Sequence, residues 1–411
     1  MKISNQHLCG PFGMALYKNE KFYFEPNRYN SLACKSYNKF ETIWKIETPE
    51  YEILHSKIIE NKLSLAGKWL FDFETLKIDE IIIPNLIAEQ YYFHWDKNLD
   101  FLRLTIRNEN KFFEGIYDVQ NSKILWQKEL YTFSSDYVFE NEIIIKSIYL
   151  DGKIDTYGSK GTQKAFIAFN FLTGSTLWQR SFEELGITQL DKFVGDVGDV
   201  LVCAFDEYNL IGLDKTTGNE LWRVKHKAKL LNGILNAPSQ SIYLFYGWAD
   251  EDETIEQVNL NLLEIDSQTG QIRYDDDIFK HPNHQAVAGL RGNVFYGYPK
   301  FYSALQWGEV IYFLVPISGI GPLAQIMAFD TVQKCIVEVS EQFFTTFHQW
   351  FVAEGKLFIT AKVGKNIDSE INTDPSYHER VYDTGRFDGT TFHHQYFLIS
   401  KEEYLTIIDL E

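Results

Sequence analysis

The sequence predicts an all-β fold, a single β-propeller of seven or eight four-stranded antiparallel blades, and three observations support this prediction. Aromatic residues make up 16% of the 411 residues, and a high content of Phe, Tyr and Trp favours strands over helices. Short segments of alternating apolar residues recur along the whole chain, separated by Asp, Asn, Thr and Gly. One such unit returns at intervals close to the period of a propeller blade.

The repeat is clearest at residues 210–222, which read LIGLDKTTGNELW, and at residues 166–178, which read FIAFNFLTGSTLW. Recognisable copies lie at 262–274 and 115–126, and weaker ones lie near both ends of the chain. The Asp or Asn that opens the turn of each copy falls at positions 38, 72, 118, 170, 214, 266 and 330, so successive copies are 34 to 64 residues apart.

Each part of the unit has a mechanical role in a blade. The Asp or Asn side chain accepts hydrogen bonds from backbone N–H groups just ahead of it, which closes a tight turn. The Gly takes a backbone conformation with positive φ, which residues with a Cβ resist. The Trp that ends the next strand is a large flat group suited to packing between neighbouring blades. We therefore expect each copy to form two strands joined by this turn.

The units together form one domain over residues 1–411. Eight units result if the segments 350–352, 357–360, 396–399 and 405–408 supply the strands of the last blade. The alternative is that N-terminal strands complete the last blade, which would close the ring, remove its free edges and leave seven blades. The approximate units are 1–46, 47–80, 81–128, 129–182, 183–224, 225–276, 277–340 and 341–411.

The unit resembles the PQQ-type repeat of quinoprotein-like propellers, whose pattern is roughly alanine–hydrophobic–aspartate, two residues, threonine–glycine, a few residues and then tryptophan. The full pattern is present around Asn170 and Asp214, and the resemblance spans most of the chain. It implies the propeller fold, which enzymes, assembly scaffolds and binding modules share.

The dehydrogenases that give the repeat its name carry an adjacent cysteine pair, a Ca²⁺-holding acid and a catalytic aspartate. The four cysteines of this sequence are scattered, at Cys9, Cys34, Cys203 and Cys335. No residue can be carried over as a cofactor ligand. We therefore expect a non-enzymatic branch of the family, with no cofactor.

The formal net charge of −18 bears on partners and location. Nucleic acid and anionic membranes are disfavoured because phosphate contacts need clustered Lys and Arg, whereas a basic protein would be attracted. Scattered cysteines and an N-terminus without an apolar segment predict a cytoplasmic protein. The uncharged stretch 310–329 is long enough to span a membrane, but Pro and Gly near its centre predict two buried strands joined by a turn at 318–322.

Three insertions exceed the repeat, at 150–162, 248–256 and 364–394, and the first is expected to be a long hairpin. Loops held by a rigid scaffold often carry function. The second insertion is strongly acidic and the third is rich in charged residues, so both suit a basic partner. The predicted partner-binding residues are Asp250, Glu251, Asp252, Glu253, Asp368, Glu370, Asp374 and Glu379.

Catalytic and metal-binding motifs are missing from the sequence, which contains no nucleophile elbow, zinc-protease helix or phosphate-binding loop. The histidine pairs His281/His284 and His393/His394 have no partner at a metal-ligand spacing, so no metal site is expected.

The leading hypothesis is therefore a non-enzymatic, protein-binding propeller that is monomeric when free. Its most specific version is an immunity protein that neutralises a basic toxin, as in toxin–antitoxin pairs. One alternative is a hydrolase or lyase whose carboxylates and histidines converge in the central channel. Further alternatives are a PQQ-dependent dehydrogenase, against which the missing cysteine pair argues, and an outer-membrane assembly scaffold, which would need an export signal.

Overall fold

The fold comes from a computed structural model. In the part of the chain that it describes, every regular element is a β-strand, and no helix is able to cross a membrane. The described residues are 1–8, 12–18, 21–26, 31–37, 39–47, 57–60, 62–65, 69–83, 90–95, 100–108, 111–139, 142–155, 158–206, 209–225, 230–236, 239–248, 259–277, 304–316, 324–340, 343–367, 376–383, 386–387, 392–393 and 396–410.

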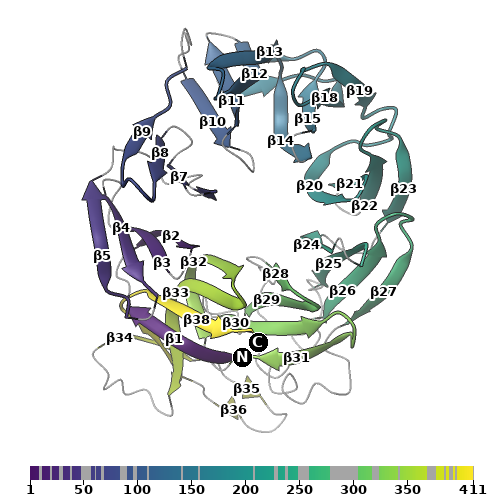
Figure 1. Cartoon of the computed structure of the whole chain (residues 1–411). Coiled ribbons are helices and arrows are strands. Elements are labelled where there is room, and N and C mark those ends of the chain that lie inside the picture. Colours follow the sequence, from purple (N-terminus) through teal and green to yellow (C-terminus); the bar gives the residue numbers. More distant parts are fainter. Residues whose placement is uncertain are drawn as a thin grey trace.

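Six four-stranded antiparallel sheets follow one another around a closed ring (Figure 1). The first three blades are β2 (Phe12–Lys18), β3 (Lys21–Pro26), β4 (Ser31–Ser36) and β5 (Thr42–Glu47); β6 (Lys57–Ile59), β7 (Lys62–Leu65), β8 (Trp69–Asp72) and β9 (Ile78–Glu80); and β10 (Gln90–Trp95), β11 (Phe101–Asn108), β12 (Lys111–Asp118) and β13 (Lys123–Glu129).

The fourth to sixth blades continue the same strand order. They are β14 (Thr132–Phe139), β15 (Ile143–Tyr149), β18 (Lys164–Asn170) and β19 (Thr176–Ser181); β20 (Leu190–Val197), β21 (Val200–Phe205), β22 (Asn209–Asp214) and β23 (Glu220–Lys225); and β24 (Leu230–Asn236), β25 (Ser241–Trp248), β26 (Asn259–Asp266) and β27 (Ile272–Asp277).

The seventh sheet has ten strands and contains two four-stranded arrays, joined by the bridge between Ala324 and Phe344. The first array is β28 (Ala304–Trp307), β29 (Val310–Pro316), β30 (Ala324–Asp330) and β31 (Cys335–Val339). The second, which we call the closing array, is β32 (Phe343–Ala353), β33 (Lys356–Ile367), β38 (Tyr404–Asp409) and β1 (Lys2–Leu8). The remaining strands of this sheet are β34 (Tyr377–Asp383) and β37 (Tyr396–Ser400).

The predicted all-β propeller with four-stranded antiparallel blades is therefore confirmed. In the described residues it comprises seven sheets around the axis, and the seventh is built from two arrays. This double sheet is where the sequence left the choice between seven and eight blades open.

The ring closes through the N-terminal strand, as one of the two sequence alternatives required. β1 is the outer strand of the closing array and runs antiparallel to β38, with Lys2 opposite Asp409, and Figure 1 shows the two chain ends side by side. The segment 396–399 is a strand of the last sheet, as predicted, but β1 and not this segment is the fourth strand of the closing array. The segment lies in β37, which pairs with the end of β33 because β33 continues past the last residue that β38 covers.

The uncharged stretch 310–329 forms two antiparallel strands, β29 and β30, with Val310 opposite Asp330. The prediction of two buried strands is confirmed, and the turn expected between them lies outside the described residues. Cys34, Cys203 and Cys335 are buried free thiols. Burial raises the pKa of Cys34 to about 11, so this thiol stays protonated at neutral pH.

The turns after the third strands share one geometry, seen clearly in the fifth blade. The N–H of Gly218 donates to the carbonyl of Asp214 at 2.8 Å, and the Asp214 carboxylate accepts from the N–H groups of Thr216 and Thr217 at 3.0 and 2.7 Å. This is the turn that the sequence predicted. In seven such turns the residue four positions after the opening one has a positive φ: Phe40, Leu76, Ser122, Gly174, Gly218, Gly270 and Lys334.

The first turn opens two residues earlier than the sequence suggested. Phe40 N–H donates to the Ser36 carbonyl at 3.0 Å, so Ser36 is the opening residue rather than Asn38, which lies outside the described residues. The corrected register places Trp44 eight residues after the opening residue. Trp126, Trp178 and Trp222 stand at the same interval in their own blades.

Candidate functional site

The strand order divides the connections of the propeller between two opposite faces. Strands within a blade run antiparallel in chain order, so first-to-second and third-to-fourth connections leave one face, which we call the turn face. Second-to-third connections leave the other, which we call the loop face. All three insertions lie between a second and a third strand, namely β15 and β18, β25 and β26, and β33 and β38. The strand ends that border them therefore share the loop face.

Most of the predicted partner-binding residues lie outside the described residues: Asp250, Glu251, Asp252, Glu253, Asp368, Glu370 and Asp374. Glu379 lies within β34, which pairs with β37 in the seventh sheet. The acidic run 250–253 is bordered by the end of β25 at Trp248 and the start of β26 at Asn259. Sequence analysis identified these segments but not their common face, because that depends on the position of each strand in its blade.

The insertion of the fourth blade contains a hairpin, as predicted, in which β16 (Lys153–Asp155) pairs with β17 (Gly158–Lys160). At its base the Asp151 carboxylate accepts hydrogen bonds from the Thr162 hydroxyl at 2.6 Å and the Gln163 N–H at 2.9 Å. These bonds lower the pKa of Asp151 to about 2, with Thr162 the largest contributor. The carboxylate is therefore ionised at neutral pH and holds the two ends of the insertion together.

The closing array extends the propeller on the same face. The first half of β33 pairs with β38, and its last four residues, Gly364–Ile367, pair with β37. β37 pairs in turn with β34. Since β33 runs toward the loop face, this three-stranded extension of the sheet adds surface there. A further short hairpin of β35 (Arg386–Phe387) and β36 (Phe392–His393) belongs to the same insertion.

Tryptophan side chains join the middle blades to one another. The indole N–H of Trp222 donates to the carbonyl of Ser267, the residue after the opening Asp of the next blade, at 2.8 Å. Trp126 and Trp178 make the equivalent bonds to Phe171 at 2.7 Å and to Lys215 at 2.8 Å. All three indoles are at least nine-tenths buried. The packing role that the sequence predicted for Trp is confirmed for these three joints.

The repeat glycine lies against the same indole. A Cβ placed on Gly218 would lie 2.5 Å from Trp178, and one on Gly270 would lie 2.8 Å from Trp222. Gly174 stands in the same relation to Trp126, at 2.5 Å. Glycine is thus required twice, for the positive φ of the turn and for the close approach of the neighbouring indole.

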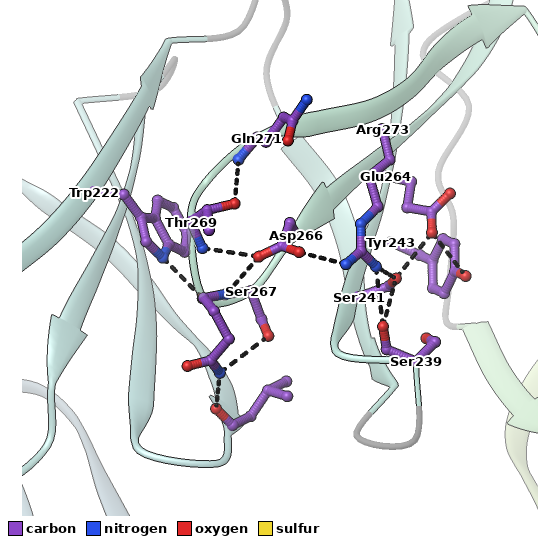
Figure 2. Close-up of polar contacts among 12 residues, drawn as sticks. Trp222, Ser239, Ser241, Tyr243, Glu264, Asp266, Ser267, Thr269, Gln271 and Arg273 are labelled. Atoms are coloured by element: carbon purple, nitrogen blue, oxygen red, sulfur yellow. Dashed lines mark hydrogen bonds and ion pairs between the residues drawn. The ribbon is translucent and has the colours of Figure 1, made fainter.

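A network of polar side chains begins at the third of these joints (Figure 2). Asp266 opens the turn against which Trp222 packs, and its carboxylate pairs with Arg273. Arg273 also donates to the Ser241 hydroxyl at 2.8 Å, and this hydroxyl donates to the Glu264 carboxylate at 2.8 Å. Figure 2 shows Ser241 lying between Arg273 and Glu264, with the Ser241 and Tyr243 hydroxyls directed at the same oxygen of the Glu264 carboxylate. Tyr243 donates to Glu264 at 3.2 Å.

Lys334 enters this network from the neighbouring array and pairs with Glu264. Its ammonium also lies over two aromatic rings, 5.3 Å from the centroid of Tyr243 and 5.7 Å from that of Tyr274. The side chain of Glu264 is 7% exposed and that of Lys334 is 26% exposed. Two positive and two negative groups thus balance within the network, which joins the sixth blade to β30 and β31.

A second buried ion pair joins the third and fourth blades. Lys146 on β15 lies 2.8 Å from the Glu114 carboxylate on β12, and both side chains are less than one-tenth exposed. The Thr105 hydroxyl donates to the same carboxylate at 3.2 Å. The contact connects two blades and completes the hydrogen bonding of a buried charge, which is a structural task.

The inner strands hold one further polar contact. The hydroxyl of Tyr137 on β14 donates to the Asp196 carboxylate on β20. Burial, supported by this hydrogen bond, raises the pKa of Tyr137. Burial also lowers the pKa of Lys192 on β20. In the part of the chain that the structure describes, no three His, Cys, Asp or Glu side chains gather closely enough to hold a metal ion.

Comparison with known proteins places the chain by fold alone. No protein-family model and no curated protein matches the sequence. A crystal structure of a eukaryotic initiation factor is similar over 97% of this chain and 91% of its own, with 10% identity and a TM-score of 0.54. The dihydro-heme d1 dehydrogenase NirN is similar over 98% of this chain and 80% of its own, with 7% identity and a TM-score of 0.51.

The quinohemoprotein alcohol dehydrogenase of Comamonas testosteroni is similar over 97% of this chain and 76% of its own, with 8% identity and a TM-score of 0.50. Propellers of PQQ-dependent enzymes are thus among the folds that this chain resembles, in agreement with the repeat found in the sequence. Propellers of these different proteins share one architecture, so the likeness establishes the fold and leaves the activity to the site.

Proposed function

We propose that the protein is a non-enzymatic binding propeller that holds a basic protein partner on its loop face. The observation that carries this proposal is the common face of the three insertions, each of which lies between the second and third strands of its blade or array. A rigid ring that gathers long insertions on one side is the usual arrangement for a binding surface. The net charge of −18 favours a basic partner through electrostatic attraction.

The proposed contacts are the acidic residues predicted from the sequence, in the runs 250–253 and 368–379. Their carboxylates would steer a basic partner to the loop face and set its orientation there. The most specific version of the role is an immunity protein in the cytoplasm, monomeric until it binds a basic toxin. Masking the active surface of a toxin needs a broad face rather than a catalytic centre.

The test is affinity capture of the tagged protein from its own cell extract, followed by quantitative binding of the recovered partner. We expect one basic protein at a stoichiometric amount. Changing Asp250→Asn and Glu251→Gln together should weaken its affinity by about tenfold at low salt, because electrostatic attraction accelerates association. The matched control is Glu41→Gln with Glu74→Gln, which removes two exposed carboxylates from turns on the opposite face. An equal loss of affinity in both double variants would refute binding on the loop face. The immunity role is tested by expressing the partner without this protein, which should be toxic to the cell.

A further inference from the structure

The joint between the sixth blade and the neighbouring array replaces the repeat pattern with a different pair of residues. Eight residues after its opening residue the sixth blade has Tyr274 where the three preceding blades have Trp. Four residues after Asp330, the next turn has Lys334 where the three preceding turns have Gly. Lys334 keeps the positive φ of those glycines, at 57°. At this joint a tyrosine thus replaces the indole, and a long cationic side chain replaces the glycine that faces it.

The surroundings of the Lys334 ammonium have the composition of an ammonium-binding site. The faces of Tyr243 and Tyr274 lie 5.3 and 5.7 Å from the nitrogen, a distance at which an aromatic ring attracts a cation. The buried carboxylate of Glu264 supplies the counter-charge. Ser241 and Tyr243 donate to that carboxylate at 2.8 and 3.2 Å, which keeps it oriented toward the cation.

All parts of the site except Lys334 belong to the sixth blade. Ser241 and Tyr243 lie on β25, Glu264 on β26 and Tyr274 on β27. Arg273, the nearest other cation of this network, is held by Asp266 and by Ser241 and Ser239, to which it donates at 2.8 and 2.9 Å. The blade therefore presents a preformed site, and the cation comes from outside the blade.

From this geometry we infer that the sixth blade carries a binding site for a primary alkylammonium group, which the chain's own Lys334 occupies as an internal ligand. The ligand class is the side chain of a lysine or a small aliphatic amine. The site lies on the turn face, since Lys334 belongs to a third-to-fourth turn, and it is therefore independent of the protein-binding role proposed for the loop face.

Removal of the internal ligand provides the test. Lys334→Gly restores the repeat glycine at a positive φ and empties the site. n-Butylammonium has the four carbons and the amine of a lysine side chain, and it should raise the thermal midpoint of this variant by about 1–3 °C at a tenfold excess over its dissociation constant. The wild type should show no such rise because Lys334 fills the site. n-Butanol, the neutral analogue, should have no effect on either protein.

The counter-charge is tested by adding Glu264→Gln to the Lys334→Gly variant, which should abolish the response to n-butylammonium. An equal response in the wild type, in the double variant or to n-butanol would overturn the inference. A second measurement uses the unaltered protein. An amine-acylating reagent should modify Lys334 at least about tenfold more slowly than the exposed Lys45 on β5. The reason is that the Lys334 ammonium is surrounded by two aromatic rings and paired with a carboxylate, both of which favour its charged, unreactive form. Reaction of both lysines at the same rate would also overturn it, even if the variants failed to fold.

Discussion

Two kinds of joint between neighbouring blades occupy equivalent places in the ring but use different chemistry. The first kind is found at the three joints from the third to the sixth blade, and the second is the joint between the sixth blade and β30–β31. In the first three, a buried indole packs on a glycine and donates to a backbone carbonyl. In the other, Tyr274 and Lys334 take those positions, and the partly buried ion pair between Lys334 and Glu264 joins the two sides. At these four joints the two residues therefore change together, because each of the three indoles leaves no room for a Cβ on the glycine that it contacts.

The largest effect should come from removing an indole. Trp222→Ala should lower the free energy of unfolding by about 3–5 kcal/mol, because a buried aromatic side chain is lost and a cavity remains. The Ser267 carbonyl also loses its donor. Denaturant unfolding measures the change, and Leu221→Ala is the control, since Leu221 is adjacent but 48% exposed. A similar loss in both variants would show that the indole is not what joins the blades.

The next effect separates the two requirements for glycine. Gly218→Ala should cost about 1–3 kcal/mol for the forced contact with Trp178, in addition to about 1 kcal/mol for the positive φ. Gly308→Ala is the matched control, because Gly308 has a φ of 56° and no atom within 4 Å of an added Cβ. Equal destabilisation of the two variants in denaturant unfolding would mean that backbone strain alone explains the repeat glycine.

The charged joint should respond to salt in a way that the indole joints do not. Glu264→Gln should cost about 1–2 kcal/mol, less than the roughly 3–5 kcal/mol lost when a fully buried pair is broken, because Lys334 is 26% exposed. That cost should shrink when NaCl is raised from about 0.05 M to about 1 M, since salt screens the interaction in the unchanged protein. The cost of Trp222→Ala should stay the same over this range. Unfolding curves at both salt concentrations test the contrast, which fails if both costs change in parallel.

The smallest effect concerns the turns that both kinds of joint share. Hydrogen bonds from Thr216 and Thr217 outweigh burial and lower the pKa of Asp214 below its usual 3.8. A lowered pKa in the folded state stabilises the protein above the unfolded pKa, and this stability is lost as the pH falls below about 4. Asp214→Asn should change stability by less than about 0.5 kcal/mol at neutral pH, because Asn170 performs the same task in the fourth blade at 2.9 Å.

Thermal midpoints measured across pH test this last expectation. The unchanged protein should have a slightly higher thermal midpoint than Asp214→Asn at neutral pH, and this difference should disappear in acid. A difference that grows as the pH falls would contradict the assigned direction of the pKa.

The sequence predicted the fold well because the repeat encodes local events. The turn after Asp214 needs only its own five residues, and alternating apolar residues define the strands beside it. Prediction was less accurate where the repeat is weak. Ser36 has neither the carboxylate nor the amide of the other opening residues, so the turn was placed two residues late, at Asn38. The segment 396–399 has a strand pattern, and the pattern gives no information about its pairing partner.

The candidate sites show the same division. The acidic run 250–253 and the insertion 364–394 could be found in the sequence because composition is local. Their common face could not, since it follows from the alternation of strand direction around the ring. The Lys334 site could not be found either, because Glu264 and Lys334 lie 70 residues apart in separate copies of the repeat, and the repeat pattern does not show that they meet.

The amino-acid sequence by itself determined the all-β class, the repeated turn, the inter-blade role of Trp and the strongly acidic character. The acidic character follows from composition alone, and the other three depend on residues within about one repeat, where hydrogen bonding and side-chain volume act over short distances. Only the tertiary structure decided how the ring closes through β1, why glycine must face Trp126, Trp178 and Trp222, and which cation lies against Glu264. These features depend on contacts between blades, and such contacts exist only once separate parts of the chain have packed together.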